Sequence, residues 1–383
     1  MALEVSTITA PDELDALRRP WLGLLERADN ELPFLQPEWM SSWWRTFHQR
    51  GRLIRDSLRV TVVRDGAGEV LGIVPLMTTE RPHFGPLRAR SVGFIGADRY
   101  VTEQRAPIVD PARQVEVARA LASHLLGSGD WDWLAWHGLD AQSAFARELD
   151  RAMPLEWGEA VTASVLPLPA SWEEFRGGLK RNIKESLRRC SNSLKRDGHT
   201  ARLVVVERPD ELGPALDTFF TLHRMRSQQV DALPHPDRFA EQPSRRFLRQ
   251  VCGSLAARGV ARVLLLEVDG TAVAARVAFQ MPGCLYLYYS GYDPAWSKYS
   301  VATTIVAETI RHAIGRGVPR LHLSMGQDVS KSRWGPETTL RHDATWVRRR
   351  LSSRAARELY TWGRQSAWLD RTLGGLLPKR RFD

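Results

Sequence analysis

The residues best suited to chemistry lie in a short loop that leads into a helix. Residues 291–300 are rich in Gly, Asp, Pro and Ser, which are typical of a loop, and they end at Lys298, Tyr299 and Ser300. From Val301 onward, apolar residues recur at helical spacing. The first N–H groups of a helix lack intrahelical partners, and the helix dipole adds partial positive charge at that end. The loop therefore predicts a site for an anion such as a phosphate group.

Neighbouring elements must hold this loop in place. The sequence predicts a buried, Tyr-rich strand over residues 285–290 and a helix over residues 301–314. Gly317 ends the helix, and Pro319 prevents it from resuming. Residues 321–325 then alternate as a second strand. The expected order is therefore strand, loop, helix, turn and strand.

A basic loop with an aromatic residue follows the second strand. It carries Lys331, Arg333 and Trp334 within a polar segment. Cations beside an aromatic ring suit an acidic or phosphorylated substrate, whereas a surface loop held by a single Trp is an equally good interpretation. We predict that Lys331 and Trp334 bind the substrate together with Arg226.

The order of these elements resembles the cofactor half of the GNAT acyltransferase fold. The similarity is closest to the CelD/BioF2-like acetyltransferase domain family, and it covers about residues 165–350. The residues that carry it are Gly291, Tyr292, Asp293, Tyr299, Ser300, Gly326, Lys331 and Trp334. The chain departs from that pattern at Val301-Ala302, where the family has Pro-Gly, and at His322, where it has an acidic residue.

This resemblance implies acyl-CoA as donor co-substrate and no metal. In that family, loop amides hold the diphosphate of acyl-CoA, and the backbone of the preceding strand positions the thioester. The implied cofactor-binding residues are Tyr289, Ser290, Gly291, Lys298, Tyr299, Ser300, Val301, Ala302, Thr303 and Thr304. Arg181 and Lys184 would also reach phosphates if their helix packs beside the site.

Acyl transfer to an amine needs a group that accepts the amine proton and a group that protonates the leaving thiolate. His223 is the first candidate base, because an imidazole with an ordinary pKa of about 6.5 is neutral at physiological pH. The alternative interpretation of His223 is a histidine of the core whose ring forms a hydrogen bond to a backbone carbonyl. Asp293 is the second candidate, with a turn-forming role before Pro294 as its alternative. Tyr292 is the candidate acid, or a lid.

Two regions of the sequence look like distant copies of one unit. In each, a strand, a tight turn, two further strands, a helix and a strand follow in the same order, with Asp65-Gly66 and Asp269-Gly270 at the turns. This predicts an α/β fold of tandem GNAT-like domains, with mixed central sheets flanked by helices. We expect a degenerate, acceptor-side domain at 1–165, a donor-binding domain at 166–350, and a basic helical tail at 351–383.

Composition narrows the class of protein. The chain has 383 residues, enough for two domains, and its apolar content of 43% fits a globular rather than a disordered protein. No apolar run approaches the roughly 20 residues needed to span a bilayer, and no secretory signal is expected. Three widely spaced cysteines form neither a zinc motif nor a disulfide framework, which favours the cytoplasm. His235 and Asp237 lack a third ligand, so we expect no metal site.

The net charge of +10 is concentrated in two segments. Residues 179–198 hold 7 Lys and Arg against 2 Asp and Glu, and residues 341–383 hold 11 against 4. Such patches attract polyphosphates, including CoA and RNA, although solvated helix faces have the same composition.

The predicted activity is therefore N-acyl transfer from acyl-CoA to an amine of a small metabolite, amino acid or sugar. An aminoacyl-tRNA-dependent transferase of the Fem type is an alternative, since tandem GNAT-like halves occur in that family and basic patches suit tRNA. A non-catalytic partner in exopolysaccharide assembly is a further alternative, and it would have no affinity for acyl-CoA.

Overall fold

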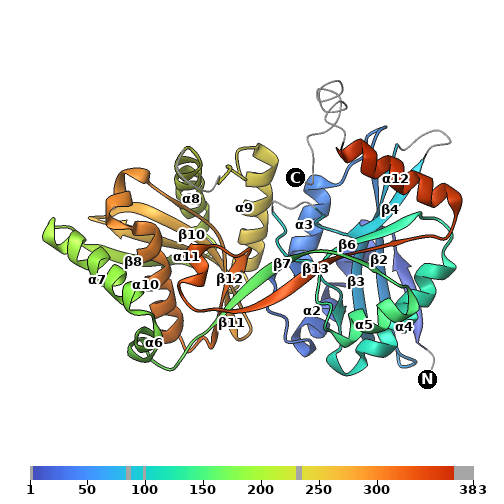
Figure 1. The fold of residues 1–383 in the computed structure, drawn as a ribbon, viewed down its shortest axis with the longest axis horizontal. Coiled ribbons are helices and arrows are strands. Elements are labelled where there is room, and N and C mark those ends of the chain that lie inside the picture. The colour runs from blue at the N-terminus through green and yellow to red at the C-terminus, as the bar shows by residue number, and fades with distance from the viewer. Residues whose placement is uncertain (1–2, 83–87, 98–100, 230–234, 366–383) are drawn as a thin grey trace. The chain divides into compact units, whose positions relative to one another are not determined.

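The computed structural model forms two compact units (Figure 1). It describes residues 3–82, 88–97, 101–229 and 235–365. Within these, the first unit comprises residues 3–30, Phe34–Val161 and residues 340–365, and the second comprises Glu31–Pro33 and Thr162–Thr339. None of the described helices is long and apolar enough to cross a membrane.

The first unit is a mixed sheet with the strand order β1-β2-β3-β4-β6-β13. Its strands are β1 (Glu4–Ile8), β2 (Arg55–Arg64), β3 (Val70–Arg81), β4 (Ala89–Phe94), β6 (Trp133–Leu139) and the main part of β13 (Glu337–Val347), and the short β5 (Ile108–Val109) pairs with β3. Its helices are α1 (Pro11–Ala16), α2 (Arg18–Arg27), α3 (Pro37–Phe47), α4 (Gln114–Gly127), α5 (Ala144–Ala152) and α12 (Leu351–Gln365), with 3₁₀ turns η1 (Pro33–Leu35) before α3 and η2 (Pro111–Arg113) before α4.

The second unit is a mixed sheet with the strand order β8-β9-β10-β11-β12-β7. Its strands are β8 (Ala201–Val206), β9 (Ala261–Val268), β10 (Thr271–Met281), β11 (Cys284–Tyr292), β12 (Arg320–Met325) and the later part of β7 (Glu156–Pro167). Its helices are α6 (Trp172–Gly178), α7 (Arg181–Arg196), α8 (Leu212–Ser227), α9 (Gln242–Ala256), α10 (Val301–Gly315) and α11 (Val329–Ser332), and the 3₁₀ turn η3 (Pro294–Tyr299) precedes α10.

The two sheets have the same topology, which confirms the predicted α/β fold of tandem units. In each, antiparallel strands lead to one parallel pair, β4 with β6 and β11 with β12, and an antiparallel strand lies on the far side of that pair. The predicted turn between β9 and β10 has positive φ at both Asp269 and Gly270, as a type I′ hairpin turn requires. In the first unit, the Asp65 carboxylate accepts the N–H groups of Ala67 and Glu69.

One strand departs from the linear division expected from the sequence. The sequence predicts residues 340–350 as part of the C-terminal domain, whereas β13 pairs with β6 of the first unit, from His342 opposite Leu139 to Val347 opposite Trp133. The partner of a strand depends on contacts that are distant in sequence, so local patterns do not reveal this return. Of the predicted tail, 351–365 is helical and 366–383 lies outside the described residues.

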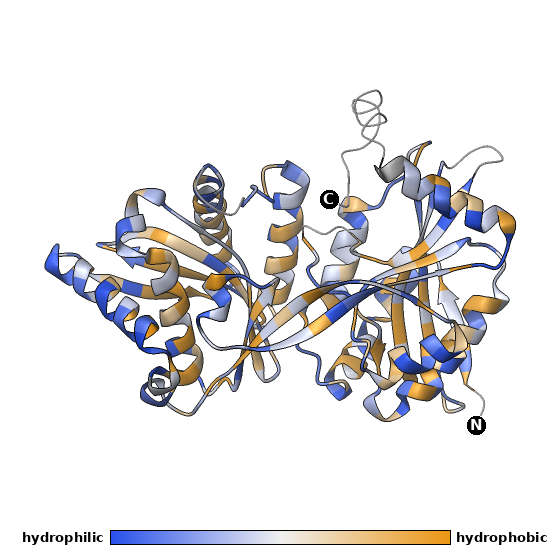
Figure 2. Ribbon diagram, viewed as in Figure 1, coloured by the Kyte–Doolittle hydropathy of each residue, from blue (hydrophilic) through white to orange (hydrophobic). Residues whose placement is uncertain are grey.

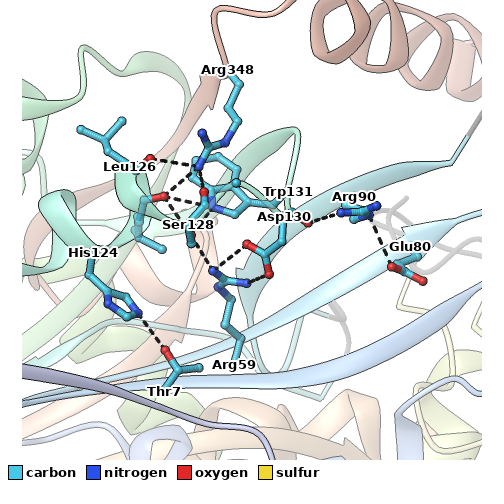
Figure 3. A network of polar contacts seen from close by, with 12 residues as sticks. Thr7, Arg59, Glu80, Arg90, His124, Leu126, Ser128, Asp130, Trp131 and Arg348 are labelled. Atoms are coloured by element: carbon cyan, nitrogen blue, oxygen red, sulfur yellow. Dashed lines mark hydrogen bonds and ion pairs between the residues drawn. The ribbon is translucent and has the colours of Figure 1, made fainter.

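Arg348 fastens the chain after β13 to the first unit (Figure 3). Its guanidinium donates to the carbonyl oxygens of Leu125, at 2.9 Å, and of Ser128. It also lies over the Trp131 ring, with its Cζ atom 4.4 Å from the ring centroid. Buried carbonyls need such donors, and a guanidinium over an indole adds a cation–π attraction. This anchor lies three residues before α12 begins at Leu351, so it holds the segment that leads into that helix.

The core of the second unit lies around α10. One stripe of this helix is buried against the sheet, including Ile305, Ile310 and Ala313. Figure 2 shows α10 mostly hydrophobic and α7 mostly hydrophilic, as the charge pattern of residues 179–198 predicts. In the first unit the Trp-rich segment 34–47 forms η1 and α3, with Trp39 and Trp43 fully buried, so these rings build core rather than a ligand site.

Helix α8 packs unusually closely on β11 at Gly291. A Cβ atom at Gly291 would lie 2.6 Å from the Cα of His223 and even closer to the backbone nitrogen of His223 and the carbonyl carbon of Leu222. These are backbone atoms, so rotation of a side chain cannot relieve the overlap. The glycine therefore sets the distance between α8 and the end of β11.

We expect Gly291→Ala to destabilise the second unit by about 2–3 kcal/mol, because the added methyl forces α8 away from β11. The measurement is urea unfolding followed by circular dichroism. Gly253→Ala in α9 is the matched control, since a Cβ there meets no atom within 4 Å, and it should be neutral or stabilising by up to about 1 kcal/mol. Equal stability of the Gly291→Ala and wild-type proteins would contradict this account of the packing.

Candidate active site

The parallel strands β11 and β12 pair only at their first residues. Three pairs join them, from Cys284 opposite Arg320 to Tyr286 opposite His322, and no further pair occurs between them within the described residues. His322 is buried and stacks on Tyr286, with ring centroids 4.7 Å apart. Beyond this point the two strands separate, so the later backbone of β11 is left without β12 as a partner.

A β-bulge lies where β11 leaves β12. Leu287 pairs with Ala278 and Ser290 pairs with Arg276, so Tyr288 and Tyr289 both stand opposite Val277. A bulge interrupts the regular ladder at this point. The interruption therefore falls at the start of the segment predicted to contact the acyl donor, at Tyr289, Ser290 and Gly291.

The start of α10 offers unpaired donors. Ser300 has a left-handed backbone, with φ 53°, and its carbonyl accepts the N–H groups of Thr303 and Thr304. The N–H groups of Val301 and Ala302 have no acceptor among the described residues. Unpaired amides at a helix N-terminus attract anions, and this end of the 15-residue helix is where the sequence predicts an anion site, which stays a prediction.

Arg333 adds a positive charge at this helix start. Its guanidinium donates to the Thr303 hydroxyl at 3.1 Å and to the Ser186 hydroxyl, on α7, at 3.1 Å. The Nε atom of Arg333 is buried and has no hydrogen-bond partner within the described chain. The sequence indicates a basic loop around Arg333 but not its place beside α10, because this contact joins residues 30 positions apart.

The side chains of Lys298 and Tyr299, both predicted to bind the cofactor, form no hydrogen bond with the start of α10 within the described residues. Tyr299 is buried, and its hydroxyl donates to the carboxylate of Asp197 at 2.9 Å. The exposed Lys298 ammonium lies 4.6 Å from the Tyr299 ring centroid, and the hydroxyl of that tyrosine raises the lysine pKa. These contacts tie η3 to the end of α7. Trp334, predicted to bind substrate, is also buried in the core of the second unit.

His223 is a buried, fully hydrogen-bonded histidine. Its Nδ1 lies 2.8 Å from the Ser290 carbonyl oxygen, and its Nε2 accepts the N–H of Arg238 at 3.3 Å. Only a neutral ring with the proton on Nδ1 satisfies both bonds. Burial lowers the pKa of His223, which favours that neutral form. The structure therefore places His223 behind the bulged strand, where it holds the Ser290 carbonyl.

Arg226 lies one turn further along α8 and joins several polar groups. It donates to the Ser290 hydroxyl at 2.6 Å and to Nε2 of His235 at 2.8 Å, and its Cζ atom lies 5.8 Å from the Tyr292 ring centroid. The Tyr292 hydroxyl donates to the Gln229 amide oxygen at 3.3 Å. Burial lowers the pKa of Arg226, and burial together with Arg226 lowers the pKa of His235.

His235 is a site residue that the sequence analysis missed. The sequence pairs it with Asp237 only as two potential metal ligands, whereas in the structure Asp237 lies 3.8 Å from His223 and His235 accepts a hydrogen bond from Arg226. Within the described residues no group of three or more His, Cys, Asp or Glu could hold a metal ion. The pairing of His235 depends on a loop conformation that has no sequence signature.

The two remaining predicted side chains, Lys331 and Asp293, form hydrogen bonds to the backbone at the end of β12 and in the turn after β11. The Lys331 ammonium donates to the carbonyl oxygens of Met325 and, at 3.3 Å, Gly326. The Asp293 carboxylate accepts the Ala295 N–H at 2.9 Å and so caps η3. Both side chains therefore shape loops beside the site.

Comparison with known proteins agrees with this geometry. Residues 181–332 match the family model described as the acetyltransferase (GNAT) domain. No curated protein sequence matches the chain.

Solved structures resemble the chain over most of its length. The crystal structure of FemX is 12% identical with a TM-score of 0.60, over 94% of this chain and 99% of that chain. The C-terminal DUF2156 domain of a putative lysylphosphatidylglycerol synthetase from Agrobacterium fabrum is 12% identical with a TM-score of 0.50, over 92% and 96%. At these identities the likeness concerns the fold. The chain thus carries a GNAT acetyltransferase domain, set in a fold that it shares with FemX.

Proposed function

We propose that this protein transfers an acyl group from acyl-CoA to an amine of a small metabolite, amino acid or sugar. The observation that carries the proposal is the separation of β11 from β12, followed directly by the unpaired amides at the start of α10. A strand that has separated from its neighbour can pair with an extended amide-containing arm, and a helix N-terminus can hold its phosphates.

The acyl donor would occupy two adjacent regions. The N–H groups of Val301 and Ala302, with Arg333 beside them, hold the diphosphate of CoA. The backbone from Tyr288 to Gly291 lies along the pantetheine arm and faces the thioester oxygen as negative charge develops on it.

In the proposed reaction the amine nitrogen attacks the thioester carbon, and the carbon–sulfur bond then breaks. The nitrogen loses its proton to water, and the departing thiolate takes one from the Tyr292 hydroxyl, which is the proposed donor and is then reprotonated from water, so that the products are an amide and the free thiol of CoA. No protein nucleophile is needed. Burial raises the pKa of the Cys284 thiol to about 12, so that thiol stays protonated and unreactive.

We propose that His223 positions the reacting groups rather than serving as the base. Both of its ring nitrogens are engaged, and the atom that it holds is the carbonyl of Ser290, within the segment that faces the thioester. Arg226 binds the hydroxyl of the same serine. The polar groups around Arg226, Tyr292 and Lys331 then form the acceptor end of the site.

Aminoacyl-tRNA is a second candidate donor. The fold shared with FemX and the exposed basic side chains of α7, among them Arg181, Arg188 and Arg189, favour it. Binding through phosphate contacts falls steeply as salt rises, so the two donors are distinguishable.

Isothermal titration with CoA and acetyl-CoA tests the donor site. We expect Arg333→Gln to weaken CoA binding by about tenfold, because a charge-assisted hydrogen bond to phosphate contributes about 1.5 kcal/mol. Arg246→Gln is the charge-matched control, since Arg246 is exposed on α9, and it should bind as the wild type does.

Two results would count against this proposal. Equal CoA affinity in Arg333→Gln and wild type would place the diphosphate elsewhere. Salt-sensitive binding of aminoacyl-tRNA without any binding of acyl-CoA would favour the second candidate, and binding of neither would favour a non-catalytic role.

The role of His223 is tested by His223→Asn. An asparagine amide can replace the Nδ1–H donor to Ser290, yet it cannot accept a proton from the amine. A positioning role predicts activity within about tenfold of wild type and an unchanged pH–rate profile, whereas loss of a general base lowers activity by about 10²–10⁴ and removes the acidic limb of that profile.

Stability against pH provides the control for this variant. The folded-state pKa of His223 lies below its unfolded value of about 6.5. The contribution of the neutral imidazole to the free energy of unfolding is therefore complete above that pH and is lost as the pH falls. As the pH is lowered from 7, thermal unfolding should show a smaller loss of stability in His223→Asn than in the wild type.

A further inference from the structure

Helix α12 of the first unit has an exposed apolar stripe, formed by Leu351, Ala355, Leu359 and Trp362. The three large side chains of this stripe, Leu351, Leu359 and Trp362, are 86%, 58% and 63% exposed. Successive members lie three or four residues apart, so they share one face of the helix. Large apolar side chains that gather on one exposed face mark an interaction surface, whereas single ones do not.

The opposite face of α12 already holds the helix on the first unit. Ser353 is fully buried, and its hydroxyl donates to the Asp132 carboxylate at 2.8 Å. The Tyr360 ring packs on Trp133, with ring centroids 5.4 Å apart. The apolar stripe is therefore not needed for the packing of α12, and its exposure calls for another explanation.

Three exposed arginines lie at the start of the stripe. Arg349 and Arg350 directly precede Leu351, and Arg354 lies in the first turn of α12. Arg350 donates to the Gly129 carbonyl oxygen at 3.4 Å, and no carboxylate in the described part of the chain forms an ion pair with any of the three. Like charges four residues apart, as at Arg350 and Arg354, repel each other. An external anion beside them would relieve this repulsion.

A pocket of about 480 Å³ opens beside these arginines. Its lining joins Arg349 and Arg350 to apolar residues, among them Leu126, Pro154 and Trp346. All the residues that line it belong to the first unit. Guanidinium groups next to apolar surface suit a phosphate that is attached to a hydrocarbon chain.

The sequence after α12 repeats this combination of apolar and basic residues. Residues 366–383, which lie outside the described residues, hold four Lys and Arg against two Asp, together with one Trp, four Leu and one Phe. A surface of anionic lipids attracts each Lys or Arg that comes close to it. Charge and apolar content therefore favour the same partner on both sides of residue 365.

We propose that the first unit docks on an anionic phospholipid surface through α12. The apolar stripe enters the boundary between headgroups and acyl chains, while Arg349, Arg350 and Arg354 bind lipid phosphates. Helices that lie in a membrane interface carry Trp and Leu on one face and basic residues beside it. A second copy of α12 would cover the stripe but would bring no anion to the arginines except Glu358. The proposal does not depend on the acyl transfer proposed for the second unit.

Co-sedimentation with vesicles tests the proposal on the full-length protein. One set of vesicles is phosphatidylcholine alone, and in the other set about one third is replaced by phosphatidylglycerol. We expect at least tenfold stronger binding to the anionic vesicles. Most of that binding should be lost as salt rises from about 0.05 M to about 0.5 M, because screening weakens the arginine contacts.

Two results would overturn the proposal. Equal binding to both sets of vesicles would show that the arginines do not recognise lipid phosphates. Binding to neither set would show that the stripe is covered by something else, such as a second copy or residues 366–383.

Variants locate the contact by the sign of their effects. Trp362→Gln should weaken binding to anionic vesicles by about tenfold, and Arg354→Gln by about fivefold. Glu358→Gln, an exposed residue of α12, should strengthen binding by about fivefold, because it removes a charge that the lipids repel. Leu53→Gln is the matched apolar control, since Leu53 is 41% exposed in the first unit but outside α12, and it should bind as the wild type does.

Thermal unfolding confirms that each variant is folded. Unchanged binding in both Trp362→Gln and Arg354→Gln would place the contact outside α12 and contradict the proposal.

Discussion

The site depends on one constraint, the separation of two parallel strands after three paired residues. Once β11 leaves β12 beyond Tyr286, its backbone groups need other partners or a ligand. A bulge at Tyr288 and Tyr289 also interrupts the ladder of β11 with β10. The start of α10, which follows β11 after only one 3₁₀ turn, then places unpaired N–H groups near the same opening.

The segment after the bulge keeps its position because α8 lies directly behind it. Gly291 permits a backbone contact that any side chain would block, and this closeness lets His223 and Arg226 reach Ser290. Burial keeps the imidazole neutral, and the neutral tautomer is the one that bonds both Ser290 and Arg238. The close packing of α8 on Gly291 and the protonation state of His223 therefore both favour the hydrogen bond to Ser290.

Much of the fold follows from local sequence signals. Asp269-Gly270 predicts its hairpin because both residues adopt positive φ readily, and the apolar spacing after Val301 predicts α10 because one stripe of that helix is buried. The return of β13 to β6 was not predictable, since the strand lies about 200 residues from its partner and carries no local mark of that pairing.

Site residues were harder to predict than elements, because side-chain direction is set by tertiary contacts. Lys298 and Tyr299 stand in the anticipated loop, yet they turn toward Asp197 and leave the helix start to backbone amides. Arg333 reaches that helix start from a loop that the sequence associated with Trp334. His235 gains its place through Arg226, a contact that no spacing rule describes.

Hydrogen–deuterium exchange with and without acetyl-CoA tests the central claim most directly. The account predicts slower exchange in the peptide that contains Val301 and Ala302 and in the peptide from Tyr288 to Gly291, with β4 and β6 of the first unit unchanged. Protection confined to the first unit, or no protection anywhere at saturating acetyl-CoA, would contradict the assignment of the donor site to the opening between β11 and β12.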